Sequence, residues 1–135
     1  MAEEEALEAL KEDLKLELGL ISLYERYIEE IGDRKIKKTL MHMVEDSTKH
    51  ALALRRLIHK ILLDKEAGEG LSKERILEIL ERGLEEEENA VEVYEGHLRV
   101  IDDREVLDRV MEICADENEH EEEIKRAIEY LLAKG

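Results

Sequence analysis

The sequence predicts an all-α protein made of two helical hairpins, and three observations favour this class. Apolar residues recur in alternating steps of three and four through four segments, which is the spacing of amphipathic helices. Pro, Phe and Trp are absent and 43% of the residues are charged, a composition that favours helices over sheets. When residues 1–65 are compared with residues 71–135, 17 of the 65 pairs are identical, which indicates a duplicated hairpin.

The first hairpin is predicted from two periodic segments. One segment runs through residues 7–31 and the other through residues 36–61. Gly32 and Asp33 interrupt the periodicity between them, and Asp33 is a suitable residue for capping the start of the second helix. Residues 1–65 therefore form the first repeat.

The second hairpin follows the same pattern. Its periodic segments run through residues 77–101 and 106–131, with Asp102 and Asp103 between them. A glycine-rich linker at residues 66–71 precedes Ser72, a predicted N-cap. We expect the second repeat at residues 72–135 to pack with the first as a four-helix bundle, so that residues 1–135 form a single domain.

Charge and composition exclude several functions. The chain carries 37 acidic and 21 basic residues, a formal net charge of -16, so we expect neither nucleic acid nor an anionic membrane as a partner. No apolar run is long enough to span a membrane and no signal peptide is recognisable, so we expect a cytoplasmic protein. Cys114 is the single cysteine, which excludes an internal disulfide or a Cys-x-x-Cys metal site. A bound metal would need oxygen and nitrogen ligands.

The apolar stripes that define the predicted seam of the bundle are interrupted near the middle of each helix. Buried carboxylates without a basic partner are costly, and a bound cation would supply the missing charge. Glu117 and His120 are three residues apart, so both lie on one face of their helix. The interrupting residues are Glu17, Ser47, His50, Glu87, Glu117 and His120.

This pattern resembles the ferritin-like superfamily, and within it the rubrerythrin-like di-iron carboxylate proteins, which use two single glutamates and Glu-x-x-His motifs on four helices. The stretches that carry the resemblance are Glu17 to Tyr24, Asp46 to His50, Glu87 to Tyr94 and Asp116 to His120.

The resemblance implies a pair of irons that reacts with peroxide or dioxygen, as in an oxidoreductase of peroxidase or ferroxidase type; manganese and zinc are alternative metals. It also implies an external electron-donor protein, because no rubredoxin-like segment is present. By position, Glu17 and Glu87 would be terminal ligands, Glu117 a bridging ligand, and His50 and His120 the nitrogen ligands. Asp46 and Asp116 would orient the histidines.

Ser47 departs from the family pattern, because it stands where a glutamate matching Glu117 is expected. A neutral hydroxyl is a poor ligand, which leaves one metal or one tight and one weak metal as alternatives to two. An exogenous ligand, or an inward turn of Glu45 or Asp46, would fill the gap. Tyr24 and Tyr94 are interpreted as core residues, Cys114 as a small buried residue, and His42 as a surface residue.

We expect a homodimer, domain-swapped or not; an up-down-up-down monomer would fit the short linker but would put the two hairpins in the wrong mutual sense for the usual site. A ferritin-like bundle needs a long crossover between its second and third helices, about 40 Å, whereas roughly eight residues of linker span at most about 27 Å. A domain-swapped dimer would remove this conflict. The alternative to the enzyme is a non-enzymatic helical bundle, with a degenerate or single-metal site, that acts as an assembly or partner-binding module.

Overall fold

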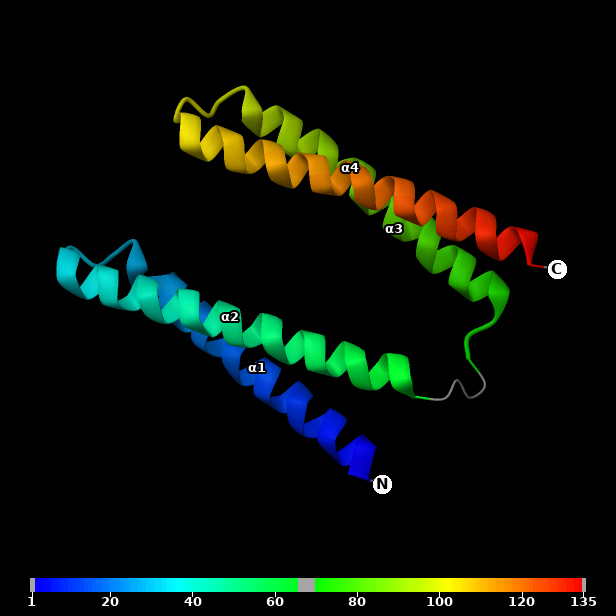
Figure 1. Cartoon of the computed structure of the whole chain (residues 1–135). Helices are drawn as coiled ribbons and strands as arrows, with labels where there is room; N and C mark the ends of the chain where they lie inside the picture. The colour runs from blue at the N-terminus through cyan, green and yellow to red at the C-terminus, as the bar shows by residue number, and fades with distance from the viewer. Residues whose placement is uncertain (1, 66–69, 135) are drawn as a thin grey trace. The chain divides into compact units, whose positions relative to one another are not determined.

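The computed structural model describes residues 2–65 and 70–134, which contain four long α-helices (Figure 1). The predicted all-α class is confirmed. The predicted linker at residues 66–71 lies outside the described residues except for Gly70 and Leu71. None of the described helices is both long and apolar enough to cross a membrane. The helices are α1 (Ala2–Ile28), α2 (Arg34–Asp64), α3 (Lys73–Leu98) and α4 (Arg104–Ala133).

The chain divides into two compact units, Met1–Gly68 and Glu69–Gly135. In the first unit α1 packs against α2, and in the second α3 packs against α4. Each pair is a helical hairpin whose two helices are joined by a short turn (Figure 1). The two predicted hairpins are therefore confirmed, and they are the components from which four-helix bundles are built. The single domain over residues 1–135 stays a prediction.

Three helices begin at the N-caps that the sequence predicts. The Asp33 Oδ1 atom accepts a hydrogen bond from the Ile36 backbone N–H at 3.1 Å, and Asp103 Oδ1 accepts one from Val106 at the same distance. Ser72 Oγ accepts a 3.1 Å bond from the Arg75 backbone N–H. Each bond satisfies a donor that has no partner inside the first turn of its helix.

The two turns shorten the predicted helices. Ile31 and Ile101 were expected at the ends of the first and third helices, but both lie outside helices and are half-buried. The cap residues explain this, because Asp33 and Asp103 adopt extended backbone conformations. An isoleucine two residues earlier therefore lies in the turn and outside the helix.

The packing face of α2 differs from the predicted seam. The buried residues of α2 are Ser47, Ala51 and Ile58. Four predicted seam residues are exposed instead: Ile36, Met43, His50 and Leu57. A neighbouring helix covers only one side of α2, and these four residues lie on the adjacent side of the helix. Within the hairpin these four residues are not covered, and their place on a seam shared by four helices stays a prediction.

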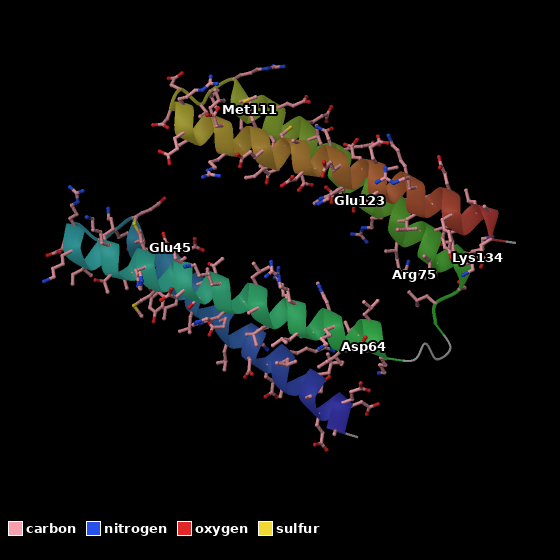
Figure 2. All side chains as sticks on the ribbon, viewed as in Figure 1. Glu45, Asp64, Arg75, Met111, Glu123 and Lys134 are labelled. Carbon is pink, nitrogen blue, oxygen red and sulfur yellow. The ribbon has the colours of Figure 1, made fainter. Side chains whose placement is uncertain are left out.

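The packing face of α4 is rotated in the same direction. Cys114 is its buried residue, whereas the predicted seam residues Val106, Ile113 and His120 are exposed. Val91 on α3 is also buried, and in the first hairpin Leu7 on α1 is buried. Burial of side chains of this size contributes about 1.5–3 kcal/mol each. Side chains that end in oxygen or nitrogen atoms project from all four helices (Figure 2).

Candidate metal centre

The first hairpin brings a glutamate and a histidine together across two helices. Glu17 comes from the middle of α1 and His50 from the middle of α2. His50 Nδ1 lies 3.4 Å from Glu17 Oε1. A carboxylate oxygen and an imidazole nitrogen at this distance are two ligand atoms of the kinds that bind Fe, Mn and Zn.

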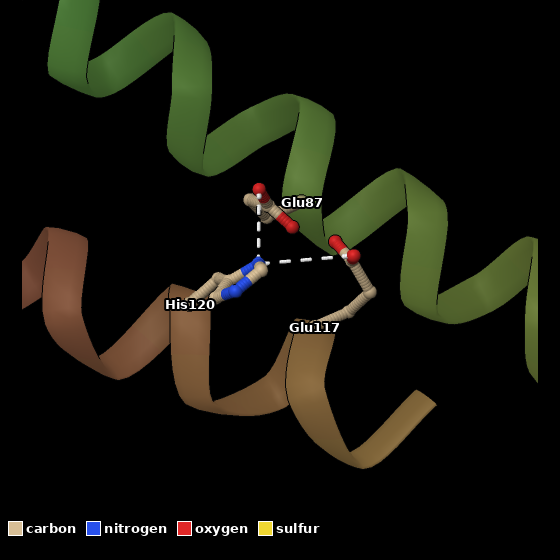
Figure 3. Close-up of side chains that lie close together, drawn as sticks. All are labelled: Glu87, Glu117 and His120. Carbon is tan, nitrogen blue, oxygen red and sulfur yellow. Dashed lines mark ion pairs between the residues drawn. The ribbon is translucent and has the colours of Figure 1, made fainter. Parts of the chain in front are cut away.

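The second hairpin joins three such side chains (Figure 3). His120 Nδ1 lies 3.6 Å from Glu87 Oε1, which comes from α3. It also lies 3.7 Å from Glu117 Oε1, one turn earlier on α4. One ligand atom from each residue lies within 4.8 Å of the other two. The spacing of three residues in α4 directs Glu117 and His120 to the same point, and helix packing adds Glu87.

The donor set fits a cation on structural grounds. The second carboxylate oxygens of Glu17 and Glu87 are buried, and neither has a hydrogen-bond partner among the described residues. No ion pair in the described part of the chain joins either glutamate to Lys or Arg; each pairs with a histidine alone. A buried, unpaired carboxylate oxygen costs at least about 1–3 kcal/mol, so a bound cation would offset a real penalty.

The glutamates and histidines differ in exposure. The side chains of Glu17, Glu87 and Glu117 are 21%, 25% and 22% exposed. Those of His50 and His120 are 65% and 47% exposed. The carboxylates are thus largely removed from water while each imidazole stays accessible at the surface of its hairpin. Within each hairpin the imidazole is therefore the more exposed member of its Glu–His pair.

Ser47 is buried against α1 in the first hairpin. It occupies the position 70 residues before Glu117, the residue that supplies the second carboxylate of the other hairpin. Because Ser47 has no carboxylate, α2 contributes His50 alone to the group around Glu17. The two hairpins therefore differ in how many candidate ligands their second helix provides.

Asp46 and Asp116 were expected to orient His50 and His120, but among the described residues they form no ion pair with them. Asp46 Oδ2 lies 3.7 Å from His42 Nδ1, one turn earlier on α2. His42 is exposed, as expected of a surface residue, and the acid four residues later is the signal in the sequence for this pair. Glu45 is exposed.

Three other residues considered from the sequence, Tyr24, Tyr94 and Cys114, lie outside the group of candidate metal ligands. Tyr24 and Tyr94 are half-buried, and the Tyr94 ring meets the His97 ring edge-on at 6.3 Å between centroids. Cys114 is a buried free thiol, as expected. These residues support the helix contacts and place no further ligand atom in the Glu87 group.

Asp13 is a residue near the site that the sequence reasoning did not single out. It lies on α1 one turn before Glu17, and both residues line a surface hollow of about 370 Å³ together with Leu16, His50, Ala53 and Leu54. The spacing of four residues between Asp13 and Glu17 could have identified it. The first hairpin thus has a second acid, Asp13, beside the Glu17 and His50 pair.

Paired helices with glutamates and histidines in their middle turns define a helical carboxylate–histidine protein of the ferritin-like class. The chain belongs to the Rubrerythrin family, whose sequence model matches residues 8–128. That match includes all five ligand candidates. No curated protein and no solved structure gave a significant match.

Proposed function

We propose that this chain binds iron through Glu17, His50, Glu87, Glu117 and His120 and that the iron site reacts with peroxide or dioxygen. The observation that carries the proposal is the convergence of Glu87, Glu117 and His120 within 4.8 Å. Membership of the Rubrerythrin family supports iron as the metal. The reaction would serve either defence against oxidants or the oxidation of Fe(II). Manganese and zinc are the alternative ions.

The chain's own residues would bind the ion and balance its positive charge. Three glutamates supply anionic oxygens and two histidines supply neutral nitrogens, a mixed set that suits divalent first-row metals. The bound iron would supply one-electron redox chemistry toward an oxidant. The buried, unpartnered oxygens of Glu17 and Glu87 would gain a cationic partner, while the exposed imidazoles leave the ion accessible to a small oxidant.

The proposal includes two partners, a second copy of this chain and an electron-donor protein. The eight residues between the end of α2 and the start of α3 form a short connection, which favours a homodimer over a long crossover within one chain. Sustained turnover would draw electrons from another protein, because one cysteine cannot form a rubredoxin-type site. Sedimentation analysis at several protein concentrations tests the homodimer. A monomer at all concentrations would contradict it.

The experiment for the proposed function loads the untagged protein with Fe(II) under anaerobic conditions, removes excess metal and counts bound iron by mass spectrometry. Peroxide or air is then added, and the conversion of Fe(II) to Fe(III) is followed by absorption. We expect retained iron and oxidation faster than that of Fe(II) in buffer. Glu117→Ala should reduce both, whereas Glu119→Ala, an exposed residue on the same helix, should reduce neither.

The result also separates the two functional classes. Retained iron that does not react with peroxide or dioxygen would leave a metal-binding protein without the proposed activity. No bound iron in the wild type would contradict the proposal and favour the alternative, a helical module for assembly or partner binding.

A further inference from the structure

The two hairpins place their carboxylates on different helices. In the second hairpin Glu87 comes from α3 and Glu117 from α4, and position 83 is a glycine. In the first hairpin the position matching Glu117 is Ser47, while the position matching Gly83 is Asp13. Each hairpin therefore has two acids and one histidine near its middle, but both acids of the first hairpin come from α1.

Asp13 and Gly83 face their neighbouring helices in the same way. A Cβ atom placed on Gly83 would contact the Ile124 Cδ1 atom of α4 at 3.7 Å. The matching residue of α2 is Leu54, which lines the hollow together with Asp13. Asp13 therefore lies on the side of α1 where residues of α1 and α2 line one hollow, which Glu17 and His50 also line.

The contacts of Asp13 leave its carboxylate available. In residues 2–65 and 70–134 no ion pair or side-chain hydrogen bond is formed by Asp13, which is exposed. Glu17 is one turn further along α1, and helical side chains lean toward the N-terminus of their helix, so Glu17 reaches back over the turn that carries Asp13. The second oxygen of Glu17 is buried without a hydrogen-bond partner.

We propose that Asp13 is the third ligand of a divalent metal ion held in the first hairpin with Glu17 and His50, replacing the carboxylate that Ser47 lacks. This inference rests on the proposed function, because it assigns the ligands of one half of that centre. It requires the Asp13 side chain to rotate toward Glu17, since among the described residues three ligand atoms lie within 4.8 Å of one another only in the group of Glu87, Glu117 and His120. Two carboxylates and an imidazole suit Fe(II), Mn(II), Co(II) and Zn(II).

The test uses the full chain and Co(II) as the probe, because its absorption reports ligand number. Wild type, Asp13→Asn and Glu12→Gln are titrated in parallel, and bound metal is counted by mass spectrometry. Glu12 is the exposed neighbour of Asp13 and controls for the loss of one negative charge. We expect Asp13→Asn to weaken one of two Co(II) sites by at least about tenfold, while Glu12→Gln keeps both sites within about twofold.

A double variant tests whether a carboxylate on α2 can replace that of Asp13. Adding Ser47→Glu to Asp13→Asn should restore the second Co(II) ion, because a carboxylate then returns from α2. Circular dichroism should show equal helix content in the wild type, Asp13→Asn and Glu12→Gln, since Asp13 and Glu12 are exposed.

Two results would overturn the inference in different ways. Equal Co(II) binding by Asp13→Asn and Glu12→Gln would show that Asp13 is not a ligand, and the proposed function would survive because the wild type still binds metal. A wild type that binds no Co(II) and no Fe(II) would overturn the proposed function together with the inference.

Discussion

His120 Nδ1 on α4 lies 3.6 Å from Glu87 Oε1 on α3. The same relationship joins His50 and Glu17 at 3.4 Å in the other hairpin. In each hairpin a histidine on one helix faces a largely buried glutamate on the other, so the pair lies across the helix contact itself. Hairpin packing thereby places one candidate oxygen ligand and one candidate nitrogen ligand at matching positions of the two units.

Glu87→Gln should weaken metal binding by at least about tenfold. The substitution keeps the size of the side chain but removes the anionic charge that faces His120. Co(II) titration followed by absorption and calorimetry measures the change. Glu81→Gln is the control, because Glu81 is an exposed residue of α3 and its loss should change affinity by no more than about twofold. Equal effects of the two substitutions would show that only overall charge matters.

Ser47→Glu should destabilise the metal-free protein and stabilise the metal-loaded one. Ser47 is buried, so a longer, charged side chain should cost roughly 1–3 kcal/mol without a cation. A bound ion should offset this cost and tighten metal binding. Thermal unfolding with and without Co(II) measures both effects. Ser47→Gln, which has similar size and no charge, should show the cost without the metal-dependent gain; the same gain in both variants would contradict the role of the carboxylate.

Asp103→Ala should lower the free energy of unfolding by about 0.5–2 kcal/mol, because the Val106 backbone N–H loses its hydrogen-bond acceptor. Urea unfolding followed by circular dichroism measures the loss. Asp103→Asn should retain most of the stability, since its side-chain oxygen still caps the helix. The preceding residue provides a matched control: Asp102→Ala removes an exposed acid that caps no helix and should change stability by less than about 0.5 kcal/mol.

Ile58→Ala should destabilise the first hairpin by about 2–5 kcal/mol, because it removes a buried side chain from the contact with α1. Leu63→Ala on the same helix removes an exposed side chain and should cost less than about 0.5 kcal/mol. Thermal unfolding of both variants beside the wild type gives the comparison. Similar losses would mean that Leu63 is covered in solution, which sedimentation analysis would then trace to self-association.

Much of the fold could be predicted because helices are specified by neighbouring residues. Apolar spacing gave the four helices, and the capping residues Asp33, Ser72 and Asp103 gave three of their starts. The ends of α1 and α3 were placed about three residues too late, because Ile31 and Ile101 continue the apolar period into the turns. Apolar spacing alone cannot distinguish a helical residue from one that lies in a turn.

The sequence by itself determined the helices, their caps and the chemical types of the ligands. Tertiary structure decided which side of α2 and α4 meets the neighbouring helix, and with it the exposure of His50 and His120. It also placed Asp13 in the hollow beside Glu17. The physical reason is that helical periodicity fixes which residues share a face of one helix, whereas the contact between two helices depends on how their side chains interlock.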